Sequence, residues 1–213
     1  MAQCEAIVTY CNERLQAASF DDYCPNGLQV EGRAEVRRIV SGVTACQALL
    51  DAAIGDGADL VLVHHGYFWR GEAAPLVGMK ARRLATLFKA GTGLLAYHLP
   101  LDAHQELGNN RQLGLRLGFD RGAPIDGLLW GTELERAMPA DALVARIEAA
   151  LGRAPLVVGR AAAVGRVAWC TGAAQGMIEQ AAAEGFDDFI SGEISEQTVH
   201  QALSLIHISE PTR

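Results

Sequence analysis

Asp59-Leu60-Val61-Leu62-Val63-His64-His65-Gly66 is an apolar run that continues without a break into two adjacent histidines and a glycine. The run is continuous rather than alternating, which is typical of a strand covered on both faces in a parallel sheet. Open α/β sheets bind ligands outside the carboxyl ends of their strands, which is where the two histidines fall. A buried strand end has no structural need for two imidazoles, so the stretch predicts an α/β fold with a metal site at this end.

A second stretch has the same arrangement. Gly93 to Tyr97 is another short apolar run, and it is followed by His98-Leu-Pro-Leu-Asp-Ala-His104. Pro100 lacks a backbone N–H and biases the residue before it away from helix, so we expect a loop at this strand end. Two neighbouring strands would then bring imidazoles and a carboxylate to one place.

The histidines and Asp102 predict a centre with two metal ions. Adjacent residues in an extended chain point to opposite sides, so we expect His64 and His65 each to hold a different ion. Two first-row metals roughly 3.5–4 Å apart and bridged by a carboxylate form a recurrent hydrolytic centre, in which Asp102 is the candidate bridge. The alternative is that His64 and His65 are hydrogen-bonded loop histidines. For His98 and His104, single histidines in a loop, an ordinary polar role is the favoured interpretation.

Composition and charge exclude several classes of protein. The chain has 213 residues, 50% hydrophobic and 20% charged, which is enough to bury one sizeable core or two small ones. No apolar run approaches the roughly 18 residues of a membrane span, and the amino terminus lacks the pattern of a secretory signal. A net charge of −7 argues against a nucleic-acid partner. Five widely spaced cysteines without a C-x-x-C motif indicate a reducing cytoplasm.

Periodicity predicts alternating helices and strands joined by a right-handed crossover. The expected helices cover about 2–17, 44–54, 78–90, 109–117 and 140–151, and the expected strands cover 28–30, 38–43, 59–63, 94–97, 154–158 and 167–170. Beyond Phe119 the pattern predicts a connection that contains Gly and Pro.

An internal repeat appears at a shift of 128 residues, where Ile39 to His65 lies over Val167 to Glu193. Strand, helix, glycine stop and second strand fall in phase, although two generic β-α-β units would also align in this way. A duplication puts Glu193 in the place of His65, and Ser191 to Glu196 becomes a candidate rim of the same cleft.

The last ten residues, Ser204 to Arg213, resemble the translation of a sequencing-library adaptor. We therefore expect them to be non-native and the reading frame to be cut in its final part. Segments of this kind are excluded from fold reasoning, so His207 and Glu210 are not counted as a metal site.

Four long motifs resemble the Nif-three-like family, whose bacterial members are called GTP cyclohydrolase 1 type 2 homologues or dinuclear metal centre hexameric proteins. The motifs are Asp22-Tyr-Cys-Pro-Asn-Gly-Leu-Gln-Val-Glu-Gly32, His64-His-Gly-Tyr-Phe-Trp69, Tyr97-His-Leu-Pro-Leu-Asp-Ala-His104 with Leu107-Gly-Asn-Asn110, and Ser191-Gly-Glu-Ile-Ser-Glu-Gln-Thr198. The resemblance covers residues 1–203 as a single domain. It implies two interlocked α/β lobes, one of about 1–120 plus a carboxyl-terminal return and one of about 121–190. It also implies a toroidal homohexamer with a two-metal site that faces the inner cavity.

The resemblance also implies the ligands. His64, His65 and Asp102 match three of them, while the family's remaining His and Glu, in a G-H-x-x-x-x-E-like segment, have no match here. His98 is left beside the ligands, with an expected role in orienting Asp102 or the bound water. The cofactor is two divalent ions, for which zinc, iron, manganese, cobalt and nickel all suit nitrogen and oxygen ligands.

The family name implies a metal-dependent hydrolase in which hydroxide attacks C8 of the guanine ring of GTP, a small-molecule substrate. No side chain is assigned a catalytic role. The alternative function is a non-catalytic metal-binding scaffold, regulator or metal carrier.

Overall fold

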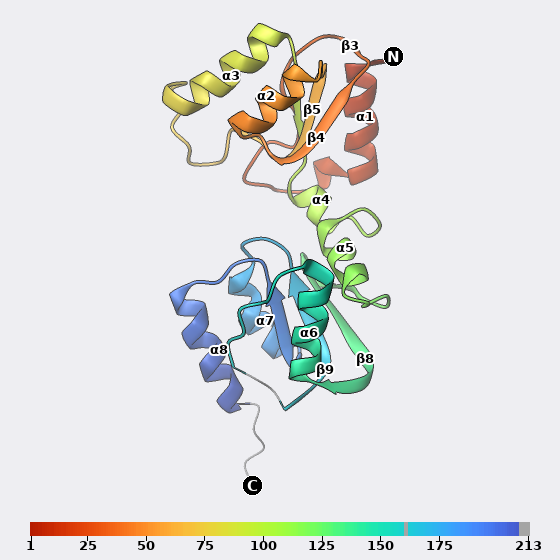
Figure 1. Ribbon diagram of the computed structural model, residues 1–213, viewed down its shortest axis with the longest axis vertical. Coiled ribbons are helices and arrows are strands. Elements are labelled where there is room, and N and C mark those ends of the chain that lie inside the picture. The colour runs from red at the N-terminus through yellow and green to blue at the C-terminus, as the bar shows by residue number, and fades with distance from the viewer. Residues whose placement is uncertain (160–161, 209–213) are drawn as a thin grey trace. The chain divides into compact units, whose positions relative to one another are not determined.

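The structure is a computed structural model in which residues 1–159 and 162–208 are described, and it divides into two compact α/β units (Figure 1). The first unit is Met1–Leu101 and the second begins at Asp102. Residues 204–208, the first part of the expected adaptor-like tail, continue the last helix, while residues 209–213, including Glu210, lie outside the described residues.

The first unit has a four-stranded sheet covered by helices on both faces. Its elements are β1 (Ala2–Gln3), α1 (Cys4–Leu15), η1 (Ala17–Ser19), β2 (Gly27–Val30), β3 (Glu35–Val36), β4 (Ile39–Thr44), α2 (Gln47–Gly55), β5 (Leu60–His65), α3 (Gly78–Ala90), β6 (Gly93–Ala96) and the start of α4 (Leu99–Ala103). The strand order is β2-β6-β5-β4, with β4, β5 and β6 parallel and β2 antiparallel to β6.

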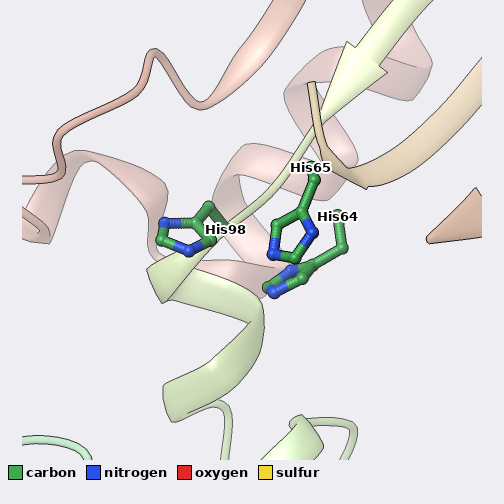
Figure 2. A group of neighbouring side chains, drawn as sticks. All are labelled: His64, His65 and His98. Carbon is green, nitrogen blue, oxygen red and sulfur yellow. The ribbon is translucent and has the colours of Figure 1, made fainter. Parts of the chain in front are cut away.

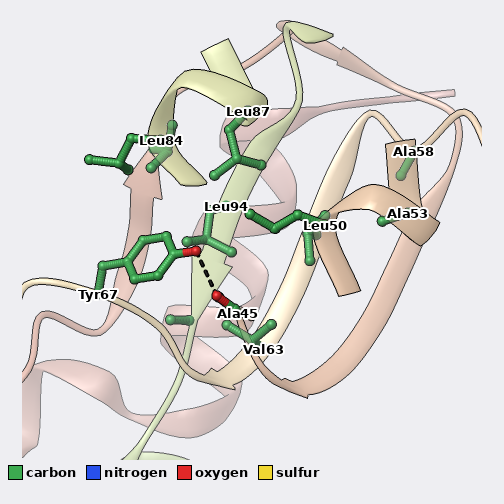
Figure 3. Packing of buried hydrophobic residues seen from close by; sticks show 12 residues of the cluster. Ala45, Leu50, Ala53, Ala58, Val63, Tyr67, Leu84, Leu87 and Leu94 are labelled. Carbon is green, nitrogen blue, oxygen red and sulfur yellow. Dashed lines mark hydrogen bonds between the residues drawn. The ribbon is translucent and has the colours of Figure 1, made fainter. Parts of the chain in front are cut away.

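The continuous apolar pattern of β5 follows from this burial on both faces. Val61 and Val63 belong to the cluster that contains residues of α2 and α3, whereas Leu60 packs in the cluster of α1. Figure 3 shows the first cluster, in which the Tyr67 hydroxyl donates a hydrogen bond of 2.6 Å to the carbonyl oxygen of Ala45. Both faces of the strand pack against apolar side chains, so the residues before the histidines are all apolar.

The second unit also consists of a four-stranded sheet and helices. Its elements are the rest of α4, α5 (Asn109–Arg116), β7 (Ala123–Asp126), β8 (Leu129–Pro139), α6 (Ala140–Leu151), β9 (Ala163–Cys170), η2 (Gln175–Met177), α7 (Ile178–Ala183), β10 (Asp188–Ser191) and α8 (Glu196–Ile208). The strand order is β10-β9-β8-β7, and only β10 and β9 are parallel. Trp130, Trp169 and Phe119 fill the core between this sheet and α6.

The hydrogen bonds of the two units confirm the internal repeat. Ile39 pairs with Leu60 in the first unit, and Val167 pairs with Asp188 in the second, so the register is preserved at the shift of 128. The carboxylate of Asp59 accepts bonds from the backbone of Arg37 and Arg38, and that of Asp187 accepts them from Gly165 and Arg166. The glycine stops, Gly57 and Gly185, both have left-handed backbone angles, with φ of 73° and 76°. Because register, aspartate bonds and glycine stop all agree at one shift, we interpret the repeat as a duplication.

Three local expectations were wrong. The segment after His98 is not a loop but the short helix α4. Backbone N–H groups in the first turn of a helix have no intrahelical acceptor, so Pro100 fits there although it lacks an N–H. Residues 154–158 do not form a strand, and Leu156 there is 75% exposed. The connection after Phe119 contains the antiparallel strands β7 and β8.

Among the described residues, no helix combines the length and the apolar character that crossing a bilayer requires.

Asp188 is a half-buried acidic group at the start of β10, beside a cavity of about 600 Å³ that is lined by residues of α6, α7, β10 and α8 and of the connections between them. Its Oδ2 atom is buried and has no hydrogen-bond partner among the described residues. Burial, followed by the nearby charge of Asp187, raises the pKa of Asp188 to about 6. The ionised form is therefore disfavoured in the folded chain.

We predict that Asp188→Asn stabilises the chain at neutral pH. Because the pKa of Asp188 in the folded chain lies above the ordinary value of 3.8, the wild type loses stability as the pH rises from 3.8 to about 6. The asparagine of the variant does not ionise, so the variant does not lose this stability. A rise of a few degrees in Tm is expected, since about 1 kcal/mol corresponds to about 2–4 °C in a chain of this size. Thermal unfolding followed by circular dichroism over this pH range measures the difference.

Asp187→Asn is the matched control. Asp187 accepts two backbone hydrogen bonds of 2.8 Å, so the same change at this neighbour should lower Tm. A variant Asp188→Asn whose Tm difference from wild type does not depend on pH would contradict the argument.

Candidate metal centre

Three imidazoles meet at the carboxyl ends of β5 and β6 (Figure 2). His64 and His65 end β5, and His98 lies two residues after the end of β6. The ring centroids are 4.4 Å apart for His64 and His65, 5.0 Å for His64 and His98, and 5.7 Å for His65 and His98. One ring nitrogen from each residue lies within 4.8 Å of the others, so the three could hold a metal ion.

The two adjacent histidines lie side by side, although neighbouring strand residues are expected to point to opposite sides. The reason lies in the register: the last pair between β5 and β6 is Val63 with Ala96. His64 and His65 stand past that pair, and from there β5 is paired on one side only, with Thr44 of β4 opposite His65. The separate placement expected from strand alternation is therefore not what the structure shows.

Hydrogen bonds at Nδ1 set the tautomers of two of these rings. His64 Nδ1 lies 2.9 Å from the carbonyl oxygen of Tyr97, which can only accept, so Nδ1–H donates. His98 Nδ1 is likewise 2.9 Å from the Oδ1 atom of Asp22. In the neutral form each ring then carries its lone pair on Nε2, as in histidines that bind metals. His65 Nδ1 lies 3.3 Å from the Thr44 hydroxyl, where either atom can donate.

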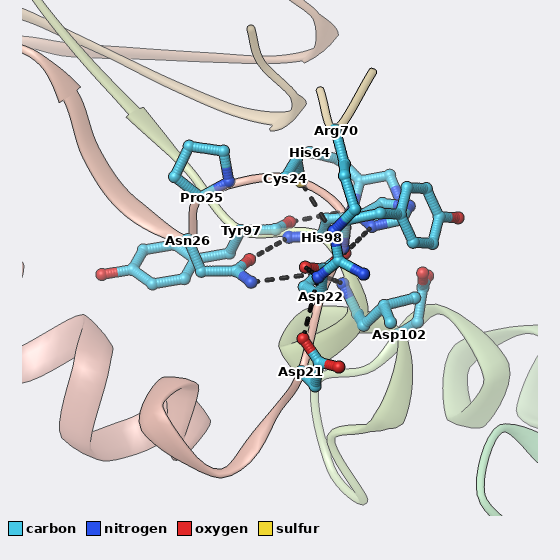
Figure 4. A network of polar contacts seen from close by, with 12 residues as sticks. Asp21, Asp22, Cys24, Pro25, Asn26, His64, Arg70, Tyr97, His98 and Asp102 are labelled. Atoms are coloured by element: carbon cyan, nitrogen blue, oxygen red, sulfur yellow. Dashed lines mark hydrogen bonds and ion pairs between the residues drawn. The ribbon is translucent and has the colours of Figure 1, made fainter. Parts of the chain in front are cut away.

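Asp22 is the anchor of His98 and of the loop before β2 (Figure 4). Its side chain is 2% exposed, and its carboxylate accepts hydrogen bonds from Tyr23 N, Asn26 Nδ2, His98 Nδ1 and Leu99 N. Burial on its own raises the pKa of Asp22, but the bonds from Asn26, His98 and Leu99 together with the charge on His98 outweigh it and lower the pKa. Asp22 is therefore a buried anion that is fully compensated.

Asp22, Cys24 and His98 are a second group with ligand atoms within reach of one another. This group is a poor metal site because the oxygens of Asp22 are already occupied by donors. Burial, then the charge of Asp22 and a hydrogen bond to it, raise the pKa of Cys24 to about 12, so the thiol keeps its proton. The ligand capacity of the first unit therefore lies in the group of three imidazoles.

Asp102 and His104 lie at the start of the second unit. Asp102 is buried on α4, and its Oδ1 accepts a hydrogen bond of 2.7 Å from Asn109 Nδ2. Ligating carboxylates are typically supported in this way. His104 Nδ1 accepts bonds of 3.1 Å from the backbone N–H groups of Glu106 and Leu107, which is the ordinary loop role expected for it.

The residue type of His98 favoured an ordinary loop role, and the family resemblance placed it beside the ligands. In the structure it is 6% exposed and belongs to the imidazole group. Asp22 was missed as a site residue: it opens a family motif without an assigned role, and its 76-residue separation from His98 carries no local pattern. The donor set, three imidazoles, fits zinc, iron, cobalt or nickel better than magnesium or calcium.

The sequence and fold resemble those of one family over nearly the whole chain. The model of Duf34/NIF3 (NGG1p interacting factor 3) matches residues 2–209. A Pseudomonas aeruginosa relative named GTP cyclohydrolase 1 type 2 homolog is 55% identical over 202 residues, which cover 92% of this chain and 80% of the relative. A solved structure described as protein ybgI of unknown function has a TM-score of 0.90 at 49% identity, covering 96% of this chain and 83% of that one. The protein TTHA1606 from Thermus thermophilus has a TM-score of 0.86 at 34% identity, covering 95% and 83%.

We predict that Asp22→Asn destabilises the chain by roughly 1.5–3 kcal/mol at neutral pH, the range for hydrogen bonds to a charged group. The amide keeps one oxygen but turns its NH₂ toward a donor. Because the pKa of Asp22 is lowered from 3.8 in the folded chain, its contribution is present above pH 3.8 and is lost as the pH falls through the lowered value. Urea unfolding at neutral and acid pH measures both effects.

Asp21→Asn is the control for this measurement. Asp21 is 91% exposed and pairs with Arg70, which is 67% exposed, so its removal should leave the unfolding midpoint unchanged. Equal effects at the two neighbouring positions would refute the assignment of Asp22 as the anchor.

Proposed function

Because the chain belongs to the Duf34/NIF3 family, we propose that it binds two divalent metal ions and acts as a metal-dependent hydrolase of the GTP cyclohydrolase 1 type 2 kind. The observation that carries the proposal is the group of three buried or half-buried imidazoles, two of which have their Nδ1 protons directed to a carbonyl and a carboxylate. Relatives named GTP cyclohydrolase 1 type 2 homolog support the reaction class.

The proposed ligands are His64, His65 and Asp102. The first two stand at the end of β5 with their ring nitrogens grouped, and Asp102 is a buried carboxylate oriented by Asn109. The family resemblance leaves His98 beside the ligands, where it is proposed to orient Asp102 or the bound water, and the bond between its Nδ1–H and Asp22 fixes its ring in place.

When bound, two divalent ions would supply the chemistry that ring-opening hydrolysis of GTP needs, by lowering the pKa of a water molecule and polarising an electrophile. The chain's own groups prepare the site for this. The Tyr97 carbonyl oxygen keeps the proton of His64 on Nδ1, and Asp22 does the same for His98. The backbone bond from Tyr97 N to Val63 O, 3.0 Å long, keeps the two strand ends in register beneath the rings.

The proposal extends to assembly and location. The family resemblance supports a toroidal homohexamer, which sedimentation analysis would detect. The five free cysteines support a reducing, cytoplasmic location.

We predict that alanine at His64, His65 or Asp102 lowers metal content, and that Asp102→Ala affects both ions if it bridges them. Metal content of the purified protein is measured by mass spectrometry, together with turnover of GTP. His200→Ala removes an exposed histidine of α8 and should leave the metal content at the wild-type level. Full occupancy by two ions in a His64→Ala, Asp102→Ala double variant would reject the ligand assignment. Metal binding without turnover would favour the scaffold or carrier function.

His98→Gln has a separate expected outcome. Loss of a group that orients ligands typically weakens metal affinity by roughly 10–100-fold without abolishing it. Competition with a chelator measures the affinity. Complete loss of metal would make His98 a direct ligand, and no change would make it an ordinary loop residue.

A further inference from the structure

Two aromatic rings stand beside the imidazole group. The centroids of Tyr23 and Trp69 are 5.6 Å apart, with a tilt of 36°. Both rings meet His98 edge to face, at 5.0 Å and 75° for Tyr23 and at 5.1 Å and 84° for Trp69. Trp69 also contacts His65, at 5.9 Å. The two rings therefore form an aromatic wall, defined here as Tyr23 and Trp69, along one side of the histidines.

The two loops that carry the wall are fastened to each other. Arg70 N donates a hydrogen bond of 2.6 Å to the carbonyl oxygen of Tyr23. The Arg70 guanidinium donates to the carbonyl oxygen of Asp22 at 3.0 Å and to the carboxylate of Asp21 at 2.9 Å. The relative position of the rings is thus set by hydrogen bonds from the backbone and side chain of Arg70 as well as by the rings themselves.

The loop that presents Trp69 contains a strained residue. Phe68, which directly precedes Trp69, has φ of 65°, in the left-handed region that residues other than glycine rarely adopt. Tyr67 N and the Tyr67 hydroxyl are bonded to Gln29 Oε1 and Ala45 O, at 2.7 and 2.6 Å. These bonds hold the turn so that Phe68 packs against the core of the first unit while Trp69 stays with the imidazoles. Strain of this kind persists at sites where it positions a functional group.

Tyr23 is 49% exposed and Trp69 is half-buried, so the wall is in part open to solvent. Aromatic faces bind planar rings by stacking and do so for any base, because every base has a π-face. Such a platform would hold a planar ring beside the imidazole group.

We propose that the wall of Tyr23 and Trp69 is the stacking surface for a planar nitrogen heterocycle of the nucleobase class, held beside the three imidazoles. This rests on the proposed function, for which it names the class of substrate and the two side chains that bind it. Tyr23 and Trp69 bind the ring, and the phosphate part of a nucleotide makes no contribution to this step.

The test is calorimetric titration of the metal-loaded protein with guanosine, which carries the base but no phosphate. Trp69→Leu and Tyr23→Leu should each weaken binding by about 5- to 150-fold, the loss typical of a stacked base. Trp69→Phe and Tyr23→Phe keep a ring and should retain most of the affinity. Tyr10→Leu removes a tyrosine of α1 that is 66% exposed and should leave binding unchanged.

Metal content and the circular dichroism spectrum are recorded for each variant, and Tyr23→Leu carries the test if Trp69→Leu does not fold. Guanosine binding that survives both leucine variants, or that the metal-loaded wild type lacks, overturns the proposal, as does binding of inorganic triphosphate in place of guanosine. Loss of binding in the leucine variants at unchanged metal content supports it. A protein that binds guanosine through the wall but holds no metal supports the stacking surface while refuting the proposed function.

Discussion

The parallel pairing of β5 with β6 is the constraint on which the histidine group depends. The pairing ends at Val63 and Ala96, and Tyr97 N then donates to Val63 O. The Nδ1–H group of His64 in turn donates a hydrogen bond to the carbonyl oxygen of Tyr97, and His98 is the next residue along the chain. Shifting β5 by one residue would move Leu60 and Val61 out of the two clusters that they fill, so packing of the strand also fixes the position of the imidazoles.

A buried carboxylate completes the arrangement. Asp22 would be costly at 2% exposure without partners, since an isolated buried charge loses its hydration. Four donors from the loop itself and from the segment after β6 remove that cost. The loop that carries Asp22 also carries Tyr23, and the backbone of Arg70 fastens it to the loop of Trp69. The imidazole group, its supporting anion and the aromatic wall are thus parts of one hydrogen-bonded structure.

The repeated unit separates what the fold provides from what the site requires. Both copies have the same strand register, the same glycine stop and the same aspartate anchor. At the positions equivalent to His64 and His65, however, the second copy has Gly192 and Glu193, and Gly192 binds the backbone of Gly172. The β-α-β frame therefore supplies a strand end in each unit, and the chemistry depends on which residues stand there.

The sequence by itself determined the α/β class, the buried strand that ends in His64 and His65, and the repeat. It also predicted the first and last residues of α3 and α6. All of these features follow from patterns of neighbouring residues along the chain. The sequence did not determine that the segment around Pro100 forms the helix α4, since a proline disfavours helix in the residue before it but is also compatible with the first turn of a helix. The contact between His98 and Asp22 was decided only by the tertiary structure. The two are 76 residues apart, and nothing local distinguishes a histidine held by a buried carboxylate from one in a solvated loop. Pairing between β5 and β6, together with burial of the loop before β2, brings them into contact, and such non-local contacts leave no periodic trace in the chain.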